Sequence, residues 1–146
     1  MIYFAYGSNM DKVQMNVRGV SYTSRRFGKL RGFKLIFNKK ASKGNYAFAN
    51  IIESENDLVE GVLYEFPDTE IRKLDEAEGF PNHYIRTTVT INDSLETPIQ
   101  AITYIANPTK IVDGLFPQKE YMDHLLAGKD LLTRDYYNML KEIETC

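Results

Sequence analysis

Hydrophobic residues in the first two thirds of the chain follow the alternating or continuous patterns that are typical of β-strands. An apolar and aromatic run over 1–6 (M-I-Y-F-A-Y) predicts a buried strand, and F-K-L-I-F over 33–37 predicts a second. Four more strands are expected, over 46–53, 59–66, 84–92 and 99–106. The stretch N-K-K-A-S-K-G-N at 38–45 carries glycine, asparagine and three lysines, so we expect an exposed loop with a solvated lysine face.

Helical patterns are short and are concentrated towards the C-terminus. The stretch D-T-E-I-R-K-L-D-E-A-E-G predicts a helix that begins at Asp68 or Thr69 and ends at Gly79. A short helix or turn is expected over 11–18, and the C-terminal third predicts two helices separated at Gly128. Together these elements predict an α+β fold: a small mixed, largely antiparallel sheet, similar to a β-barrel, with a few flanking helices.

Composition narrows the class of protein. The 146 residues, 43% of them hydrophobic and 26% charged, predict a single globular domain over 1–146. A net charge of −2 gives no basic footprint for nucleic acid or an anionic membrane, no apolar run approaches the roughly 18 residues of a membrane span, and the N-terminus lacks a leader pattern. The lone Cys146 excludes an internal disulfide and favours a reducing, cytoplasmic location.

Most motifs that mark known chemistry are missing from the sequence. There is no phosphate-binding loop, no dinucleotide fingerprint, no C-x-x-C pair and no H-E-x-x-H, so we expect neither a cofactor nor a metal. The two histidines, His83 and His124, lack the spacing of zinc ligands. His83 follows the turn at 79–81 and could lie near a site, but we interpret it as an exposed turn residue. We interpret His124 as a surface or boundary residue.

Carboxylates and backbone groups remain as candidates. In L-D-E-A-E-G at 74–79, Asp75 and Glu78 share one face of the predicted helix and Glu76 points elsewhere. Negative charge at a helix C-terminus opposes the helix dipole, which fits either a functional acid or an ordinary solvated helix end. From the residues alone, Tyr84 fits a core or a catalytic position, and the G-S-N stretch at 7–9 fits a simple turn or a backbone binding site.

Three motifs occur in order along the chain: Y-F-A-Y-G-S-N-M at the N-terminus, L-D-E-A-E-G-F at 74–80 and H-Y-I-R at 83–86. Together they resemble the γ-glutamylcyclotransferase family, the AIG2-like group. The resemblance continues along nearly the whole chain, through V-E-G-V-L-Y at 59–64 and the spacing from Tyr121 to Gly128. The Y-G-S-N form is similar to members that act on γ-glutamyl amino acids or peptides.

The resemblance implies a cofactor-free cyclisation of a small-molecule γ-glutamyl substrate. In this reaction the α-amine attacks the γ-carbonyl carbon of its own glutamyl group, which closes 5-oxoproline and releases the attached amine. Glu78 is implied as the general acid and base. The implied substrate-binding residues are Tyr6, Gly7, Ser8, Asn9, Tyr84 and Tyr121, with the backbone N–H groups of the loop 7–9 facing the glutamyl carboxylate or the developing oxyanion.

Several alternatives stay open at this stage. The segment D-L-L-T-R-D-Y at 130–136 departs from the G-L-P-x-x-Y of close relatives, so the contacts to the far part of the substrate are in question. The chain could be a binding module that does not turn its ligand over, or a tailoring enzyme that removes a γ-glutamyl group from a larger amine. We expect the leaving amine to contact loops at 38–45 and 107–120. Ten Tyr and eight Phe could support a homodimer, although core packing accounts for them equally well.

Overall fold

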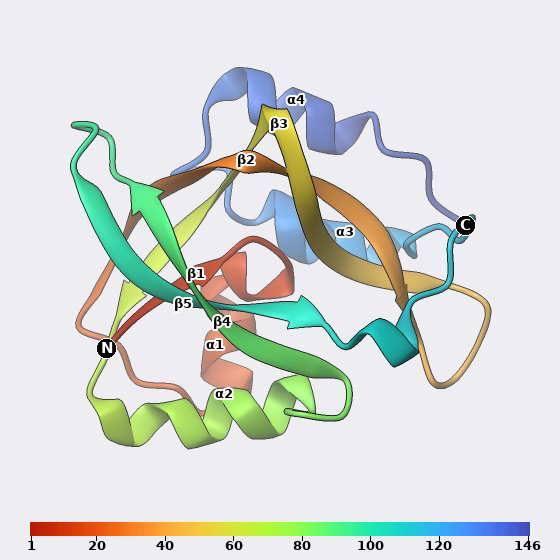
Figure 1. Cartoon of the computed structure of the whole chain (residues 1–146), viewed down its shortest axis with the longest axis horizontal. Helices are drawn as coiled ribbons and strands as arrows, with labels where there is room; N and C mark the ends of the chain where they lie inside the picture. The colour runs from red at the N-terminus through yellow and green to blue at the C-terminus, as the bar shows by residue number, and fades with distance from the viewer.

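The computed structural model describes residues 1–146, and its five strands close into a barrel (Figure 1). The strands are β1 (Ile2–Ala5), β2 (Ser24–Lys40), β3 (Ala47–Glu65), β4 (Tyr84–Asn92) and β5 (Pro98–Ala106). Their order is β1-β3-β2-β4-β5, and every pairing is antiparallel except the parallel pairing of β1 with β5. The prediction of an α+β fold with a mixed, largely antiparallel, barrel-like sheet is confirmed.

The helices are short and flank this barrel. They are α1 (Lys12–Val17), α2 (Ile71–Glu78), α3 (Lys119–Leu126) and α4 (Arg134–Lys141), with 3-10 turns η1 (Ser8–Met10), η2 (Asp68–Glu70) and η3 (Pro108–Lys110). Helix α2 ends as predicted, because Gly79 takes a left-handed φ of 64°. The C-terminal helices are separated around Gly128, also as predicted. None of the helices has both the length and the apolar character needed to cross a membrane.

Strands β2 and β3 are much longer than the sequence pattern indicates. Strand β2 already begins at Ser24, and β3 runs without a break through the two strands expected over 46–53 and 59–66. The polar stretch 54–57, which suggests a break, lies opposite the single residue Gly32 where the register shifts. Such a bulge leaves the extra residues outside the ladder, so exposed polar side chains fit there without ending the strand.

The end of β2 corrects the prediction of an exposed lysine loop over 38–45. Asn38 and Lys39 belong to the strand and are only 5% and 3% exposed, and the connection to β3 is confined to 41–46. Asn38 accepts a hydrogen bond from the Asn50 amide at 3.0 Å, and Lys39 lies opposite Phe48 on β3. These cross-strand contacts carry the hairpin three residues beyond Phe37, the last apolar position, and bury one lysine.

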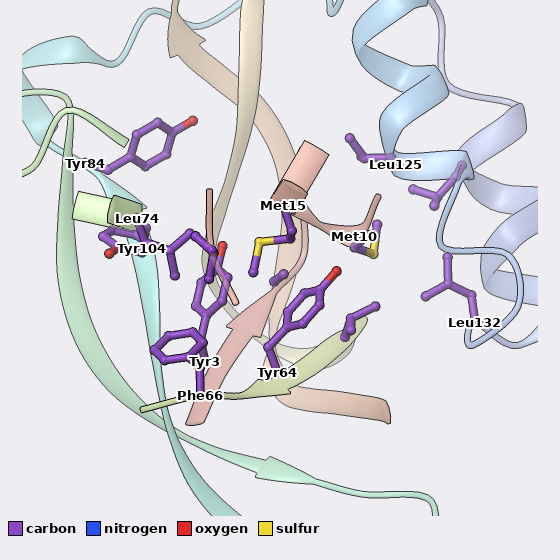
Figure 2. Close-up of a cluster of buried hydrophobic side chains, with 14 of the residues drawn as sticks. Tyr3, Met10, Met15, Tyr64, Phe66, Leu74, Tyr84, Tyr104, Leu125 and Leu132 are labelled. Carbon is purple, nitrogen blue, oxygen red and sulfur yellow. The ribbon is translucent and has the colours of Figure 1, made fainter. Parts of the chain in front are cut away.

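The core fills the barrel and the space between the barrel and the helices. Figure 2 shows the larger cluster, in which Tyr3 and Tyr64 from the barrel lie beside Met10, Met15 and Leu125 from η1, α1 and α3. The rings of Tyr3 and Tyr64 are nearly parallel, with centroids 6.2 Å apart. Because η1 and α1 supply core residues, the segment that follows β1 is packed against the barrel, and η1 also contacts α3.

Candidate active site

The loop that follows β1 is the first part of the site. Its own backbone hydrogen bonds join Met10 N–H to the Gly7 carbonyl at 3.0 Å and Asp11 N–H to the Ser8 carbonyl at 3.1 Å. The Tyr64 hydroxyl donates to the Asn9 carbonyl at 2.6 Å, and Arg25 donates to the Met10 carbonyl at 2.8 Å. The carbonyl oxygens are thus engaged by the loop itself and by the barrel, which fixes the backbone in one position.

Gly7 lets this loop approach helix α3 closely. A Cβ atom at Gly7 would lie 3.1 Å from the Tyr121 hydroxyl oxygen and 3.5 Å from the Ala49 side chain. The Tyr121 hydroxyl accepts a hydrogen bond from the Ala49 N–H at 3.0 Å. The absence of a side chain at Gly7 therefore keeps the loop, strand β3 and helix α3 around one small space.

The Asn9 amide has one orientation, which its neighbours decide. The Arg18 guanidinium can only donate, and its Nε lies 2.8 Å from Asn9 Oδ1. The amide nitrogen therefore faces the opposite way and donates to the Tyr3 hydroxyl at 3.0 Å and to Glu78 Oε1 at 2.9 Å. Asn9 is 2% exposed, so the centre of the network is shielded from water, whereas Arg18 and Glu78 at its two ends are half-buried.

Glu78 is the last residue of α2 and stands directly before the left-handed Gly79. As the spacing predicts, it shares its face with Asp75, which accepts from the Tyr104 hydroxyl at 2.7 Å, while Glu76 is exposed. Burial raises the pKa of the Glu78 carboxyl above its usual value, and Arg18, the Asn9 amide and Lys39 act in the opposite direction. A carboxyl whose pKa is raised holds a proton more readily than an ordinary glutamate, which suits a group that must accept and return one.

A cavity of about 30 Å³ lies between the loop and Glu78. All seven residues that the resemblance implies, together with three others, line it: Tyr6, Gly7, Ser8, Asn9, Glu78, Tyr84 and Tyr121, with Tyr3, Ala49 and Tyr104. The structure thus brings together every site residue expected from the sequence. Their roles towards a substrate remain predictions.

The tyrosine hydroxyls of the cavity already have partners within the protein. Tyr84 donates to the Ala49 carbonyl at 2.8 Å and Tyr6 to the Tyr104 carbonyl. Burial raises the pKa of Tyr3, Tyr6 and Tyr84 well above the usual value, so these side chains are neutral at physiological pH. The Tyr84 hydroxyl, expected to hydrogen-bond a glutamyl head, is available there as an acceptor because its proton points to Ala49.

The cavity adjoins a wider vestibule of about 530 Å³, and the two share Ser8, Glu78, Tyr84 and Tyr121 as lining residues. Charged and polar side chains complete the vestibule wall, namely Gln14, Arg18, Lys39, Ser42, Glu76 and His83. Its position beside the shared residues makes it the approach to the Glu78 carboxylate.

His83 corrects the interpretation of an exposed turn residue. The side chain is half-buried, lines this vestibule and places Nδ1 2.9 Å from the Lys39 ammonium. The other histidine, His124, lies at a partly buried boundary position as expected, where its Nδ1 is 2.8 Å from Asp11 Oδ2. Only His83 belongs to the surroundings of Glu78.

Comparison with known proteins assigns this arrangement to a family. Residues 3–124 match the family model described as gamma-glutamyl cyclotransferase, AIG2-like. The chain belongs to this γ-glutamyl cyclotransferase family. Its range includes the loop 6–9, Glu78, Tyr84 and Tyr121, so the whole lining of the inner cavity lies within the family domain.

Relatives within the family are distant. The gamma-glutamylcyclotransferases of Mus musculus and Homo sapiens are each 27% identical over 150 residues, which covers 98% of this chain and 78% of theirs. A solved gamma-glutamyl cyclotransferase superimposes with a TM-score of 0.83 at 24% identity, covering all of this chain and 89% of that one. The family fold is therefore kept at low identity.

The segment in which this family member departs from the expected pattern lies away from the cavity. Residues 130–136 line neither the cavity nor the vestibule. Thr133 instead caps α4 and contacts the buried Glu60 carboxylate through its N–H at 2.8 Å and its hydroxyl at 2.6 Å. The departure at 130–136 therefore does not change the lining of either space. Of the two loops expected to contact the leaving amine, 38–45 contributes residues to the vestibule and 107–120 does not.

Sequence reasoning missed Tyr3, Tyr104, Arg18 and Lys39. Tyr3 and Tyr104 lie in the first and last predicted strands, where the pattern predicts that an aromatic residue belongs to the core. Lys39 stands in a run with other lysines and carries no mark of its own. A signal for Arg18 would have been its position at the end of the short helix that starts just after the G-S-N turn.

Proposed function

We propose that this chain is a γ-glutamylcyclotransferase that releases 5-oxoproline from a γ-glutamyl amino acid, peptide or amine. The observation that carries this proposal is the partly buried hydrogen bond from Asn9 to Glu78, 2.9 Å, in a cavity built from the Y-G-S-N loop. It gives a carboxyl of raised pKa a fixed position beside backbone groups that can bind an anion. Family membership supports the same reaction.

The reaction needs only proton transfer and positioning. Glu78 accepts a proton from the α-ammonium of the substrate, and the freed amine attacks the γ-carbonyl carbon to form the ring C–N bond. The tetrahedral intermediate then loses the outgoing nitrogen as its bond to carbon breaks. Glu78 returns the proton to that nitrogen, so overall two protons pass from the ring nitrogen to the leaving amine and no water is consumed.

The loop serves the developing charge in this proposal. Backbone N–H groups of Gly7, Ser8 and Asn9 bind the glutamyl carboxylate or the oxyanion of the intermediate. The carbonyl groups of the same three residues already accept hydrogen bonds, so the loop need not rearrange when charge develops. Neutral tyrosines around the cavity exclude water and hold the chain of the substrate in the curled form that the ring closure requires.

Release of 5-oxoproline tests the proposal. The panel consists of γ-glutamyl-alanine, glutathione, ε-(γ-glutamyl)-lysine and the γ-glutamyl amide of a bulky amine, each with wild type and Glu78→Gln. We expect the wild type to release 5-oxoproline from at least one of them and the variant to be slower by about 10²–10⁴. No release from any member by folded wild type, despite ligand-induced thermal stabilisation, would indicate a binding module; release only from the bulky amide would indicate a tailoring enzyme.

A further inference from the structure

Lys39 is a buried cation without an anionic partner in the protein. The residue is 3% exposed, and no carboxylate lies within ion-pair distance of its ammonium. Arg25, whose side chain is 10% exposed, shows the usual arrangement, with Asp130 at 2.8 Å. Burying an uncompensated charge is costly, so the position of Lys39 requires an explanation.

The contacts of Lys39 hold the ammonium in place but leave it unsaturated. Its Nζ lies 2.9 Å from His83 Nδ1, 5.7 Å from the Phe48 ring centroid and 5.8 Å from that of Tyr84. The two rings offer cation–π attraction. An ammonium has three N–H donors, and His83 can accept only one, so two donors have no acceptor in the chain.

Lys39 shares the vestibule with Glu78. If the glutamyl head occupies the inner cavity, the outgoing nitrogen must face the vestibule, since this is the wider space that adjoins Glu78. In a γ-glutamyl amino acid the carboxylate of the leaving group is only two atoms beyond that nitrogen. An anion attached there would reach the part of the wall that Lys39 and Arg18 line.

We propose that Lys39 is a specificity-determining residue that binds the carboxylate of the leaving amino acid, with His83 positioning its ammonium. This inference rests on the proposed function and adds the basis on which the site distinguishes anionic from neutral leaving groups. The ammonium of Lys39, which feels Glu78 only from beyond ion-pair distance, gains a direct anionic partner when such a substrate binds. A charged hydrogen bond of this kind changes the specificity constant by about 10- to 100-fold.

The test compares γ-glutamyl-alanine with γ-glutamyl-alaninamide, which has the same shape but no negative charge on the leaving group. We expect wild type to prefer the acid by about 10- to 100-fold in kcat/KM. Lys39→Met keeps the aliphatic stem against the rings and should bring the ratio close to one by slowing the acid. Lys34→Met, on an exposed position of the same strand outside the vestibule, should keep the wild-type ratio.

Binding measurements separate this inference from the cyclisation itself. Calorimetry with Glu78→Gln and with the double variant Glu78→Gln/Lys39→Met measures the acid and the amide without turnover. If Glu78→Gln binds the acid better than the amide and the double variant does not, the role of Lys39 is supported. If wild type also releases no 5-oxoproline, the same result overturns the proposed cyclotransferase activity. Release at equal rates from acid and amide overturns the role of Lys39 alone. If the protein neither binds nor turns over these compounds, both proposals are overturned. If Lys39→Met does not fold, the wild-type ratio decides.

Discussion

The Asn9 side chain connects the groups on which the proposed proton transfer depends. Its oxygen is held by Arg18 and its nitrogen by Tyr3 and Glu78. A hydrogen bond donated to a carboxylate favours the charged form, as does the nearby guanidinium, while burial favours the neutral form. Burial prevails, so Glu78 keeps a raised pKa and still has a donor that orients one oxygen.

The pH dependence of turnover should report this balance. In the free enzyme kcat/KM falls as pH drops through the Glu78 pKa, because the protonated acid cannot accept a proton. Since burial raises that pKa, the acid limb should lie above the value of about 4.3 for an ordinary glutamate. Arg18→Met removes a positive charge that lowers the pKa, so its limb should move to higher pH.

The matched control for this experiment is Arg18→Lys, which keeps the charge and changes only the hydrogen-bonding geometry. Its acid limb should remain near that of wild type, even if the rate falls because Asn9 is held less well. Profiles of kcat/KM for γ-glutamyl-alanine between pH 4 and 9 provide the measurement. Identical limbs in Arg18→Met and wild type would mean that a group other than Glu78 titrates.

At the scale of elements, local patterns predicted the helices and the strands β1, β4 and β5 but not the length of the β2–β3 hairpin. Gly79 ends α2 through local backbone geometry, which a sequence displays directly. Lys39 depends on how far β2 pairs with β3, and its neighbours Lys40 and Lys43 look the same in sequence. Pairing register decides which lysine is buried, and the observed register places Lys39 opposite Phe48.

The antiparallel pairing of β1 with β3 depends on a close contact at Gly61, which offers a sharp test. A Cβ at Gly61 would lie 2.3 Å from the Ala5 carbonyl oxygen and 2.8 Å from the Phe4 ring. Because the obstacle includes backbone, Gly61→Ala should destabilise the protein by about 3 kcal/mol or more, which lowers Tm by roughly 10 °C. Thermal unfolding followed by circular dichroism measures the change.

Gly32→Ala is the control for this prediction. Gly32 has a left-handed φ of 82° but open space where a Cβ would be placed, so only the backbone cost of about 1 kcal/mol applies. Equal losses of Tm in the two variants would show that the contact of β1 with Gly61 does not limit stability.

At the scale of the whole molecule, the candidate site exists only because the barrel closes. The loop after β1, Glu78 at the end of α2, Ala49 in β3, Tyr84 at the start of β4 and Tyr121 in α3 meet around one cavity. Each local motif is visible in the sequence, and family resemblance predicted their meeting. Physical reasoning from the sequence could not predict that these segments meet, because long-range strand pairings bring them together.

A site drawn from several separate segments should stabilise all of them when it is occupied. A ligand at 100 times its dissociation constant adds about 2.7 kcal/mol to the free energy of unfolding, which corresponds to a rise in Tm of roughly 5–10 °C for a chain of this size. We expect this shift for Glu78→Gln with γ-glutamyl-alanine, which binds without being consumed. Alanine alone, which lacks the glutamyl head, should have no effect at the same concentration.

Hydrogen exchange then shows where this stabilisation acts. Backbone amides of the loop 7–10, of β3 around Ala49 and of the start of α3 should gain protection together, since the ligand contacts all three in the cavity and fixes their relative positions. The exposed bulge at 54–57 should exchange as before, because it lies outside both the cavity and the vestibule. Protection confined to the vestibule residues would place the ligand outside the cavity of Glu78 and contradict the proposed binding mode.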